Sequence, residues 1–401
     1  MMKLRSFLAG LPQRLLRVTS GGKLVPEVDG FRCIAVLGVV LYHLNGYLAV
    51  KSGLVSQVDV PETTALYNTS LLYQLFSAGH WGVQFFCAIS GFVISLPFVK
   101  RARDPGIPWS LKNYYQRRLA RLVAPYWINL LILYALLIFI KGESAAKLLP
   151  SLLASAGGVH LFLFGVPSHV NYFAWFIEVV IQFYAIAPVL IFLFRVPNPR
   201  LRRGLMLLLT LLFLDISHWI GPSPYVYNTL IGQAQFFMIG ILLADLYEDS
   251  QHVKRSATFD VLGFVAWCAI LGGPHLFQGL LLAIVMITGI FVAFYGALRG
   301  PMLGRLFSTP GLAVIGGMGY TIYLYHFPII SMNERFLLPR LAPRNHDLLL
   351  LIHAPIEIGI VLVVSAFFFL LFERPFMVRD WPKKCAAFVR SRLFPGTATS
   401  K

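Results

Sequence analysis

Long apolar blocks recur along almost the whole of this 401-residue chain. A helix needs about 20 apolar residues to cross a bilayer. Only 13% of the residues are charged, which is about half the share found in a typical soluble protein. The sequence therefore predicts an all-α integral membrane protein with about ten transmembrane helices. We expect them near residues 31–50, 81–99, 122–140, 173–194, 204–220, 227–246, 257–273, 276–297, 310–331 and 349–372.

An eleventh apolar block, "LLPSLLASAGGVHLFLFGVP" at 148–167, contains Pro150 and a Gly157-Gly158 pair. If this block does not cross, 28 of the 34 Lys and Arg residues fall on one side of the membrane. Positive loops favour the cytoplasmic side. If the block crossed, the cluster Arg195, Arg200, Arg202 and Arg203 would move outside. We therefore predict that 148–167 is re-entrant or interfacial and that both termini are cytoplasmic.

Three parts are expected along the chain. Residues 1–26 form a basic cytoplasmic N-terminal segment, 27–376 a membrane domain, and 377–401 a short basic cytoplasmic tail. The net charge of +17 resides in the loops between apolar blocks, so we expect a lipid bilayer and no nucleic acid as partner. The four cysteines and ten histidines are dispersed, which predicts neither a disulfide framework nor a metal site.

The first apolar block, "DGFRCIAVLGVVLYHLNGYL" at 29–48, carries Arg32 and His43. Eleven helical residues make three turns plus about 20°, so both side chains lie on one face, about 16 Å apart. Asp29 is one turn from Arg32 and could pair with it. Arg32 could simply anchor the helix at the interface, and His43 could make an interhelical hydrogen bond. Two ionisable groups on one intramembrane face nevertheless favour a functional site.

A basic stretch, "NYYQRRLARLVAPYW" at 113–127, holds Arg117, Arg118 and Arg121, and Arg101 and Arg103 lie just upstream. Five arginines within 21 residues exceed what membrane orientation needs. A phosphate-bearing acyl donor would suit such a cluster, because guanidinium groups bind phosphates in bidentate fashion. Anionic lipid headgroups would suit it as well.

Further polar residues interrupt other apolar blocks. Ser90 and Gly91 in "GHWGVQFFCAISGFVISLPF" could let another helix approach closely. Glu178 must be neutral, paired or in a wet cavity. His326 lies in "GMGYTIYLYHFPII", and Glu373 in "LFERPF" could form an interfacial ion pair.

Several of these motifs occur together in an order that resembles the acyltransferase-3 family of bacterial membrane acyltransferases. "VDGFRCIAVLGVVLYH" resembles the first-helix motif of the family through Arg32 and His43. "WGVQFFCAISGFVIS" resembles the Gly-Val-Asp-Phe-Phe…Ser-Gly-Phe motif, with Ser90 matching and Gln84 replacing the usual Asp. "YQRRLARLVAPYW" resembles the basic loop that enters the third helix.

The later motifs continue this resemblance. "WFIEVVIQFYAIAP" is similar to a Trp…Glu…Phe-Tyr…Pro motif, although the family's glutamates are Val180 and Ile181 here, and Glu178 is the nearby acid. "GYTIYLYHFPII" resembles a Ser-Tyr…Tyr-Leu-x-His-x-Pro motif through Tyr320 and His326. "FERPF" resembles the closing Glu-Arg-Pro-Phe. The resemblance covers about 27–376.

The resemblance implies a multi-pass O-acyltransferase of the bacterial plasma (inner) membrane, without an appended extra-cytoplasmic esterase-like domain. Such an enzyme moves an acyl group, here expected to be acetyl, from cytoplasmic acyl-CoA to a hydroxyl of a carbohydrate or macrolide acceptor. It holds no permanent cofactor. Arg32 and His43 would be catalytic, with His43 as a base or a transient acyl carrier. The donor would lie on Arg117, Arg118, Arg121, Arg101 and Arg103, with support from Glu178, His326, Tyr320, Ser90 and Glu373.

Two other functions fit the polar residues of the bundle. A transporter or flippase of a glycan or lipid would also need polar groups between helices, but it would work without acyl-CoA. A structural or lipid-binding membrane protein would tolerate neutral replacements of Arg32 and His43. Dependence on acyl-CoA and on His43 separates the enzyme from both.

Overall fold

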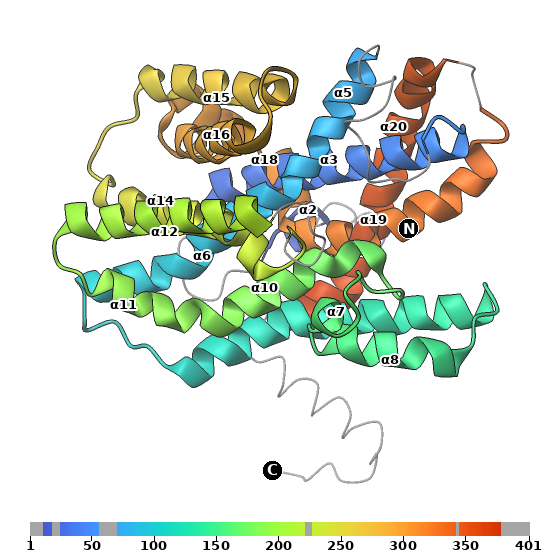
Figure 1. The fold of residues 1–401 in the computed structure, drawn as a ribbon, viewed down its shortest axis with the longest axis horizontal. Coiled ribbons are helices and arrows are strands. Elements are labelled where there is room, and N and C mark those ends of the chain that lie inside the picture. Colours follow the sequence, from blue (N-terminus) through green and yellow to red (C-terminus); the bar gives the residue numbers. More distant parts are fainter. Residues whose placement is uncertain (1–10, 18–24, 56–69, 221–226, 342–344, 378–401) are drawn as a thin grey trace, which may run out of the picture.

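Long apolar helices, most of which run in a common direction, dominate the structure (Figure 1). The computed structural model describes residues 11–17, 25–55, 70–220, 227–341 and 345–377. All regular structure within these ranges is helical. Most of the N-terminal segment 1–26 and all but Met377 of the tail 377–401 lie outside the described residues.

The helices of the membrane bundle are α3 (Pro26–Lys51), α6 (Gly82–Arg103), α7 (Leu111–Phe139), α10 (Trp175–Ile186), α12 (Pro199–Ile220), α14 (Leu230–Asp249), α15 (Ala257–Leu276), α16 (Gly279–Arg299), α19 (Gly319–Leu337) and α20 (His346–Phe368). The 12-residue α10 is part of a continuous stretch of 23 residues, Tyr172–Phe194. Shorter helices link or cover them: α2 (Leu11–Leu15), α5 (Leu71–Ser77), α8 (Ala145–Ala156), α9 (His160–Phe164), α11 (Ile191–Phe194), α17 (Pro301–Phe307), α18 (Pro310–Gly317) and α21 (Arg374–Met377). The turns η1 (Ala78–Trp81), η2 (Tyr172–Ala174), η3 (Ala187–Leu190) and η4 (Phe369–Glu373) extend several of them.

The helices match the membrane protein that the sequence predicts. In the described residues nine helical stretches are long and apolar enough to cross a membrane, and the pair α18–α19, bent by 69°, makes a tenth if it counts as one span. The all-α, multi-pass fold class is thereby confirmed. The cytoplasmic location of the two termini stays a prediction.

The apolar block at 148–167 does not form a crossing helix. Its 12-residue helix α8 is about 18 Å long, which is too short to span the hydrocarbon core. The chain then turns at Gly158 (φ +69°) and Gly165 (φ +72°), where residues with a Cβ would be strained. Trp127 Nε1 on α7 donates to the Ala156 carbonyl at 2.9 Å, so α8 packs back against α7. The block is thus a short helix followed by turns, and its re-entrant or interfacial place in the bilayer stays a prediction.

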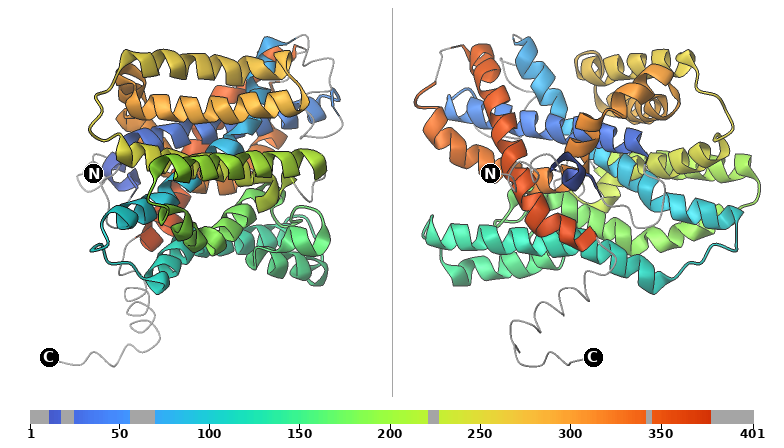
Figure 2. Two further views of the ribbon diagram at one scale, coloured as in Figure 1. Left: turned by 60° about the vertical axis from the view of Figure 1, so that its left-hand side comes forward. Right: turned by 180° about the vertical axis from the view of Figure 1, so that it is seen from behind.

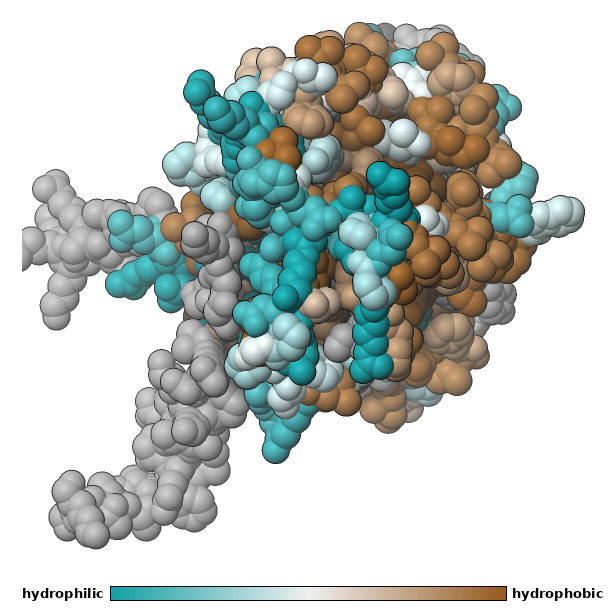
Figure 3. All heavy atoms as spheres, turned by 90° about the vertical axis from the view of Figure 1, so that its left-hand side faces the viewer, coloured by the Kyte–Doolittle hydropathy of each residue, from teal (hydrophilic) through white to brown (hydrophobic). Residues whose placement is uncertain are grey.

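Charged loops gather at one end of the bundle. The connections that follow α6, α11 and α14 emerge together at the left of Figure 1, and the turn between α7 and α8 lies at the opposite end. Figure 3 views the first end, where hydrophilic side chains cluster in the middle beside a largely hydrophobic flank. This arrangement agrees with the loop charges on which the predicted topology depends.

Helix α3 occupies the middle of the bundle and contacts α6, α18 and α19. Its side chains Phe31 and Val36 are completely buried. The pair α15–α16 lies on one flank, and α20 crosses the other helices obliquely (Figure 2). A polar side chain on α3 therefore faces protein on most sides, which is the condition for an intramembrane site.

Candidate functional site

Two histidines from distant parts of the sequence meet inside the bundle. His43 Nδ1 on α3 lies 2.9 Å from His326 Nε2 on α19. The other ring nitrogen of His326, Nδ1, lies 2.7 Å from the Tyr323 carbonyl oxygen, one turn back on the same helix. His326 is completely buried, whereas His43 retains 7% exposure. The structure thus joins a predicted catalytic residue to a predicted supporting one.

Aromatic rings enclose this histidine pair. Phe173 meets the His43 ring edge-on, with the centroids 4.4 Å apart, and Phe327 lies 6.0 Å from it. Tyr323 donates a hydrogen bond to the Phe173 carbonyl, which ties η2 to α19. The His43 ring is therefore packed on several sides and held in one orientation.

Arg32 lies on the same helix, three turns from His43. It pairs with Asp29, as the i, i+3 spacing predicts. Arg17, on the short segment after α2, lies 3.7 Å from the same carboxylate. The Asp29 carboxylate therefore faces two guanidinium groups at this end of α3.

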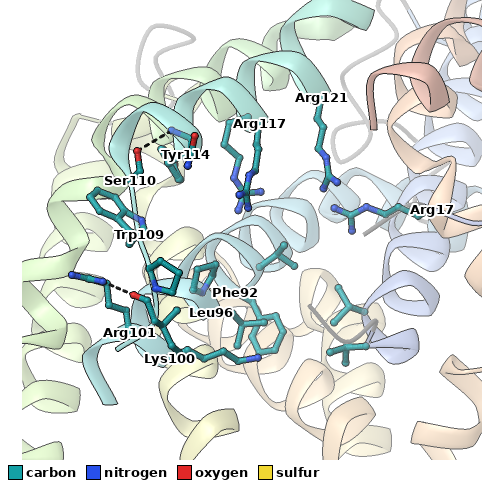
Figure 4. A pocket seen from close by; sticks show the side chains of 18 of the residues that line it. Arg17, Phe92, Leu96, Lys100, Arg101, Trp109, Ser110, Tyr114, Arg117 and Arg121 are labelled. Carbon is teal, nitrogen blue, oxygen red and sulfur yellow. Dashed lines mark hydrogen bonds between the residues drawn. The ribbon is translucent and has the colours of Figure 1, made fainter. Parts of the chain in front are cut away.

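A cavity of about 480 Å³ opens beside Arg32. Its walls come from the segment after α2, from α3 and α6, and from α7 with the loop before it (Figure 4). Arg121 and Arg17 point toward one another across the cavity, and Arg117 projects into it (Figure 4). Among the described residues, the cavity lining includes one carboxylate, Asp29, and seven cationic side chains, namely Arg17, Arg32, Lys100, Arg101, Arg117, Arg118 and Arg121. Lys100 also pairs with Glu248, outside the lining, at 3.7 Å.

Four of the five arginines expected to hold a donor line this cavity. The fifth, Arg103, lies outside its lining and pairs with Asp249 at 2.5 Å and Asp245 at 3.7 Å. Arg202 also binds Asp245, at 2.8 Å. Arg103 therefore belongs to an ion-pair network that joins α6, α12 and α14.

A smaller chamber of about 130 Å³ continues inward from the cavity. The two spaces share Arg17, Arg32, Arg118 and Arg121. Ser90, Tyr320 and Glu373, which the sequence indicates as supporting residues, also line this chamber. Its walls include Phe86, Phe176 and Tyr323, and the Tyr323 ring lies 5.8 Å from the ring of His326. The chamber thus extends from the arginines toward the histidine pair.

The supporting residues differ in what they contact. Glu373 accepts hydrogen bonds from the backbone N–H and the hydroxyl of Thr321, which fixes α19 against η4. Tyr320 donates to the Leu122 carbonyl at 2.6 Å. Glu178 lines neither space, and its carboxylate accepts from the Leu161 N–H at 3.5 Å. Glu178 therefore contacts α9, within the apolar block at 148–167.

Several residues that line the cavity or the chamber were not predicted from the sequence. Arg17 belongs to the N-terminal segment that we expected to lie outside the membrane domain, yet it lines both spaces. Trp109 and Tyr114 flank the wider cavity, and Arg118 lies over the rings of Tyr114 and Tyr184 at 5.7 and 5.5 Å. Only the excess of basic residues near the N-terminus could have pointed to Arg17.

This arrangement combines a cavity lined by cationic side chains with a buried imidazole pair. The cavity is lined in part by the loop between α6 and α7, at the end of the bundle where the charged loops gather (Figure 1), and its volume suits a drug-sized ligand. An imidazole with a free nitrogen can accept a proton or attack a carbonyl carbon. Together these parts could bring a polyanionic molecule from one membrane face to a basic group inside the bundle.

Comparison with known proteins gives the site a context. A family model described as an acyltransferase domain matches residues 25–374. The peptidoglycan O-acetyltransferase OatA of Listeria monocytogenes is 25% identical over 342 residues, which cover 78% of this chain and 50% of that protein. The O-acetyltransferase OatA of Staphylococcus aureus is 23% identical over 335 residues, covering 76% and 50%. The chain thus spans about half the length of these relatives. No solved structure matches the chain.

Proposed function

This chain belongs to the acyltransferase-3 family, and we propose that it is an O-acyltransferase that moves an acetyl group from cytoplasmic acetyl-CoA to an acceptor hydroxyl. The observation that carries this proposal is the cavity in which, among the described residues, seven cationic side chains accompany one carboxylate. Such an excess of charge in a partly enclosed space favours a polyanionic ligand. The diphosphate and the 3′-phosphate of CoA would supply the missing negative charge.

The shape of the two spaces supports a CoA thioester. The nucleotide would occupy the wider cavity, where Arg101, Arg117 and Arg118 can bind phosphate oxygens. The narrower pantetheine arm would enter the inner chamber beside Arg32 and direct the thioester toward Tyr323. Arg103 is assigned no role in donor binding, because its charge is taken up by Asp245 and Asp249.

His43 would act as a general base in the transfer. Its imidazole takes the proton of the acceptor hydroxyl while the hydroxyl oxygen attacks the thioester carbonyl carbon. The carbon–sulfur bond breaks as the new carbon–oxygen bond forms. The proton on His43 then passes to the departing thiolate, so the products are an O-acetyl ester and free CoA.

The acceptor is proposed to be a carbohydrate or a macrolide. One relative is named a peptidoglycan O-acetyltransferase, which supports a carbohydrate. Because acyl-CoA is cytoplasmic, we place the multi-pass protein in the bacterial plasma membrane with the arginine-lined cavity toward the cytoplasm. The loops that follow α6, α11 and α14 are rich in Lys and Arg and emerge at that end (Figure 1), which supports this orientation.

The experiment uses inverted membrane vesicles from cells that carry the wild-type protein or His43→Ala at equal membrane levels. The vesicles receive acetyl-CoA labelled with ¹³C in the acetyl group, and mass spectrometry follows labelled ester in the glycan and in small-molecule fractions. Label should enter an alkali-labile ester with the wild type only. If no fraction gains label while a glycan or lipid still crosses the membrane, the protein is a transporter and the proposal is wrong.

A further inference from the structure

The contacts of His326 define which nitrogen of His43 can act as a base. We infer that His326 is a positioning residue, which fixes the tautomer of His43 and leaves His43 Nε2 unprotonated toward the substrate. This inference rests on the proposed function, since it assigns a role within the same transfer. Its structural basis is the chain of hydrogen bonds that links Tyr323, His326 and His43.

This chain of hydrogen bonds begins at the Tyr323 carbonyl, whose role as an acceptor is unambiguous. A backbone carbonyl oxygen can only accept a hydrogen bond. Because His326 Nδ1 lies 2.7 Å from the Tyr323 carbonyl, that nitrogen must carry the hydrogen. A neutral imidazole has one N–H group, so His326 Nε2 is left with a lone pair.

The second step carries this assignment to α3. His326 Nε2 lies 2.9 Å from His43 Nδ1, so the lone pair must accept from an N–H on His43. The hydrogen of neutral His43 is therefore on Nδ1. The remaining nitrogen, Nε2, then holds a lone pair, as a general base requires.

Packing holds the rings of His43 and His326 in this hydrogen-bonded orientation. His326 is completely buried, so no water competes for its Nε2. Phe173 and Phe327 border the His43 ring, and their own rings pack together with centroids 3.9 Å apart. A ring flip would place a carbon against His326 Nε2 and leave a buried acceptor unpaired, which is unfavourable.

Three substitutions of His326 separate a tautomer effect from loss of packing. Glutamine can place its amide oxygen near the former Nε2 position and still accept from His43 Nδ1. Asparagine is too short to reach, and leucine fills the space without any acceptor. We expect His326→Gln to retain at least a tenth of the wild-type kcat, and His326→Asn and His326→Leu to lose at least 100-fold. The KM for acetyl-CoA should stay within about twofold in all three.

A spectroscopic readout tests the tautomer without relying on activity. Protein labelled with ¹⁵N-histidine is reconstituted in lipid, and the His43 signals are assigned by their loss in His43→Gln. In the wild type the N–H should be on Nδ1 and Nε2 should be unprotonated. In His326→Leu the Nδ1-protonated form should no longer predominate.

The outcomes distinguish this inference from the proposed function. An Nε2–H signal for His43 in the wild type overturns the inference even if the protein transfers acetyl groups. Equal kcat for His326→Leu and the wild type also overturns it, because the Val39 carbonyl, which also accepts from His43, would then suffice without His326. Absence of transfer by the wild type, with the expected tautomer observed, removes the proposed function and leaves the hydrogen-bond assignment standing.

Discussion

At the scale of single residues, His43 should matter for chemistry and not for donor binding. We expect His43→Ala to lower kcat by about 10²–10⁴-fold, the usual contribution of a general base. The dissociation constant for CoA should be unchanged, because His43 lines neither the cavity nor the chamber. Release of free CoA thiol gives the rate, and calorimetry in lipid nanodiscs gives the affinity. A variant that binds CoA weakly and reacts at the normal rate once saturated would remove His43 from the chemistry.

Arg118, in contrast to His43, should matter for donor binding. It lines both the cavity and the chamber, so Arg118→Ala removes a guanidinium from the donor-binding surface. Loss of a charge-assisted hydrogen bond costs about 1.5–3 kcal/mol, which corresponds to a rise of about 10- to 100-fold in the dissociation constant for CoA.

The matched control for Arg118 is Arg200→Ala, which removes an exposed arginine outside both linings. CoA affinity should stay at the wild-type value in this control. If both variants weaken binding equally, general surface charge is responsible and the cavity is not the donor site.

At the scale of helices, close backbone contact joins α6 to α14. A Cβ added at Gly240 would collide with the Ala88 carbonyl oxygen, and one at Gly91 with the Phe237 carbonyl oxygen. We expect Gly240→Ala to destabilise the protein by about 1–3 kcal/mol, because the two helices must separate to admit the methyl group. Thermal unfolding in detergent, followed by intrinsic fluorescence, should show a lower Tm.

Gly204→Ala serves as the control for Gly240→Ala. Gly204 lies inside α12, and a Cβ there would meet nothing within 4 Å. Alanine in a helix is favoured over glycine by about 0.5–1 kcal/mol, so the Tm should stay level or rise. A loss of stability in Gly204→Ala as large as that in Gly240→Ala would show that the close contact is not the cause.

The sequence predicts where the helices lie along the chain better than it predicts which helices contact one another. Length and apolar content locate the crossing helices, because any spanning segment must satisfy its backbone hydrogen bonds internally. The 69° bend between α18 and α19 was not predicted. Spacing along one helix also predicts the Asp29–Arg32 ion pair, because residues three positions apart are neighbours on the helix surface.

Contacts between distant residues do not follow from local pattern. His43 and His326 are 283 positions apart, and no periodicity relates them. Arg103 and Arg101 belong to one basic cluster in the sequence, yet only Arg101 lines the cavity, because acidic residues of α14 bind Arg103. Which charges face a ligand depends on packing between helices.

At the scale of the whole molecule, orientation in the membrane decides whether the cavity can meet a cytoplasmic donor. His252 and Ser144 are both exposed. The loop after α14, to which His252 belongs, and the turn between α7 and α8, to which Ser144 belongs, lie at opposite ends of the bundle (Figure 1). Each of the two residues is replaced by cysteine in a protein whose Cys268 and Cys385 are changed to serine. In intact spheroplasts a membrane-impermeant maleimide should label Ser144→Cys only, because positive loops stay inside.

Inverted vesicles from the same cells should give the opposite labelling, with His252→Cys modified and Ser144→Cys protected. That result would leave the arginine-lined cavity open to cytoplasmic acyl-CoA and the turn before α8 on the outer face. Labelling of His252→Cys in intact spheroplasts would instead place the cavity outside the cell, where no acyl-CoA is available. The seven cationic side chains would then need an extracellular anion, and the proposed direction of acetyl transfer would be wrong.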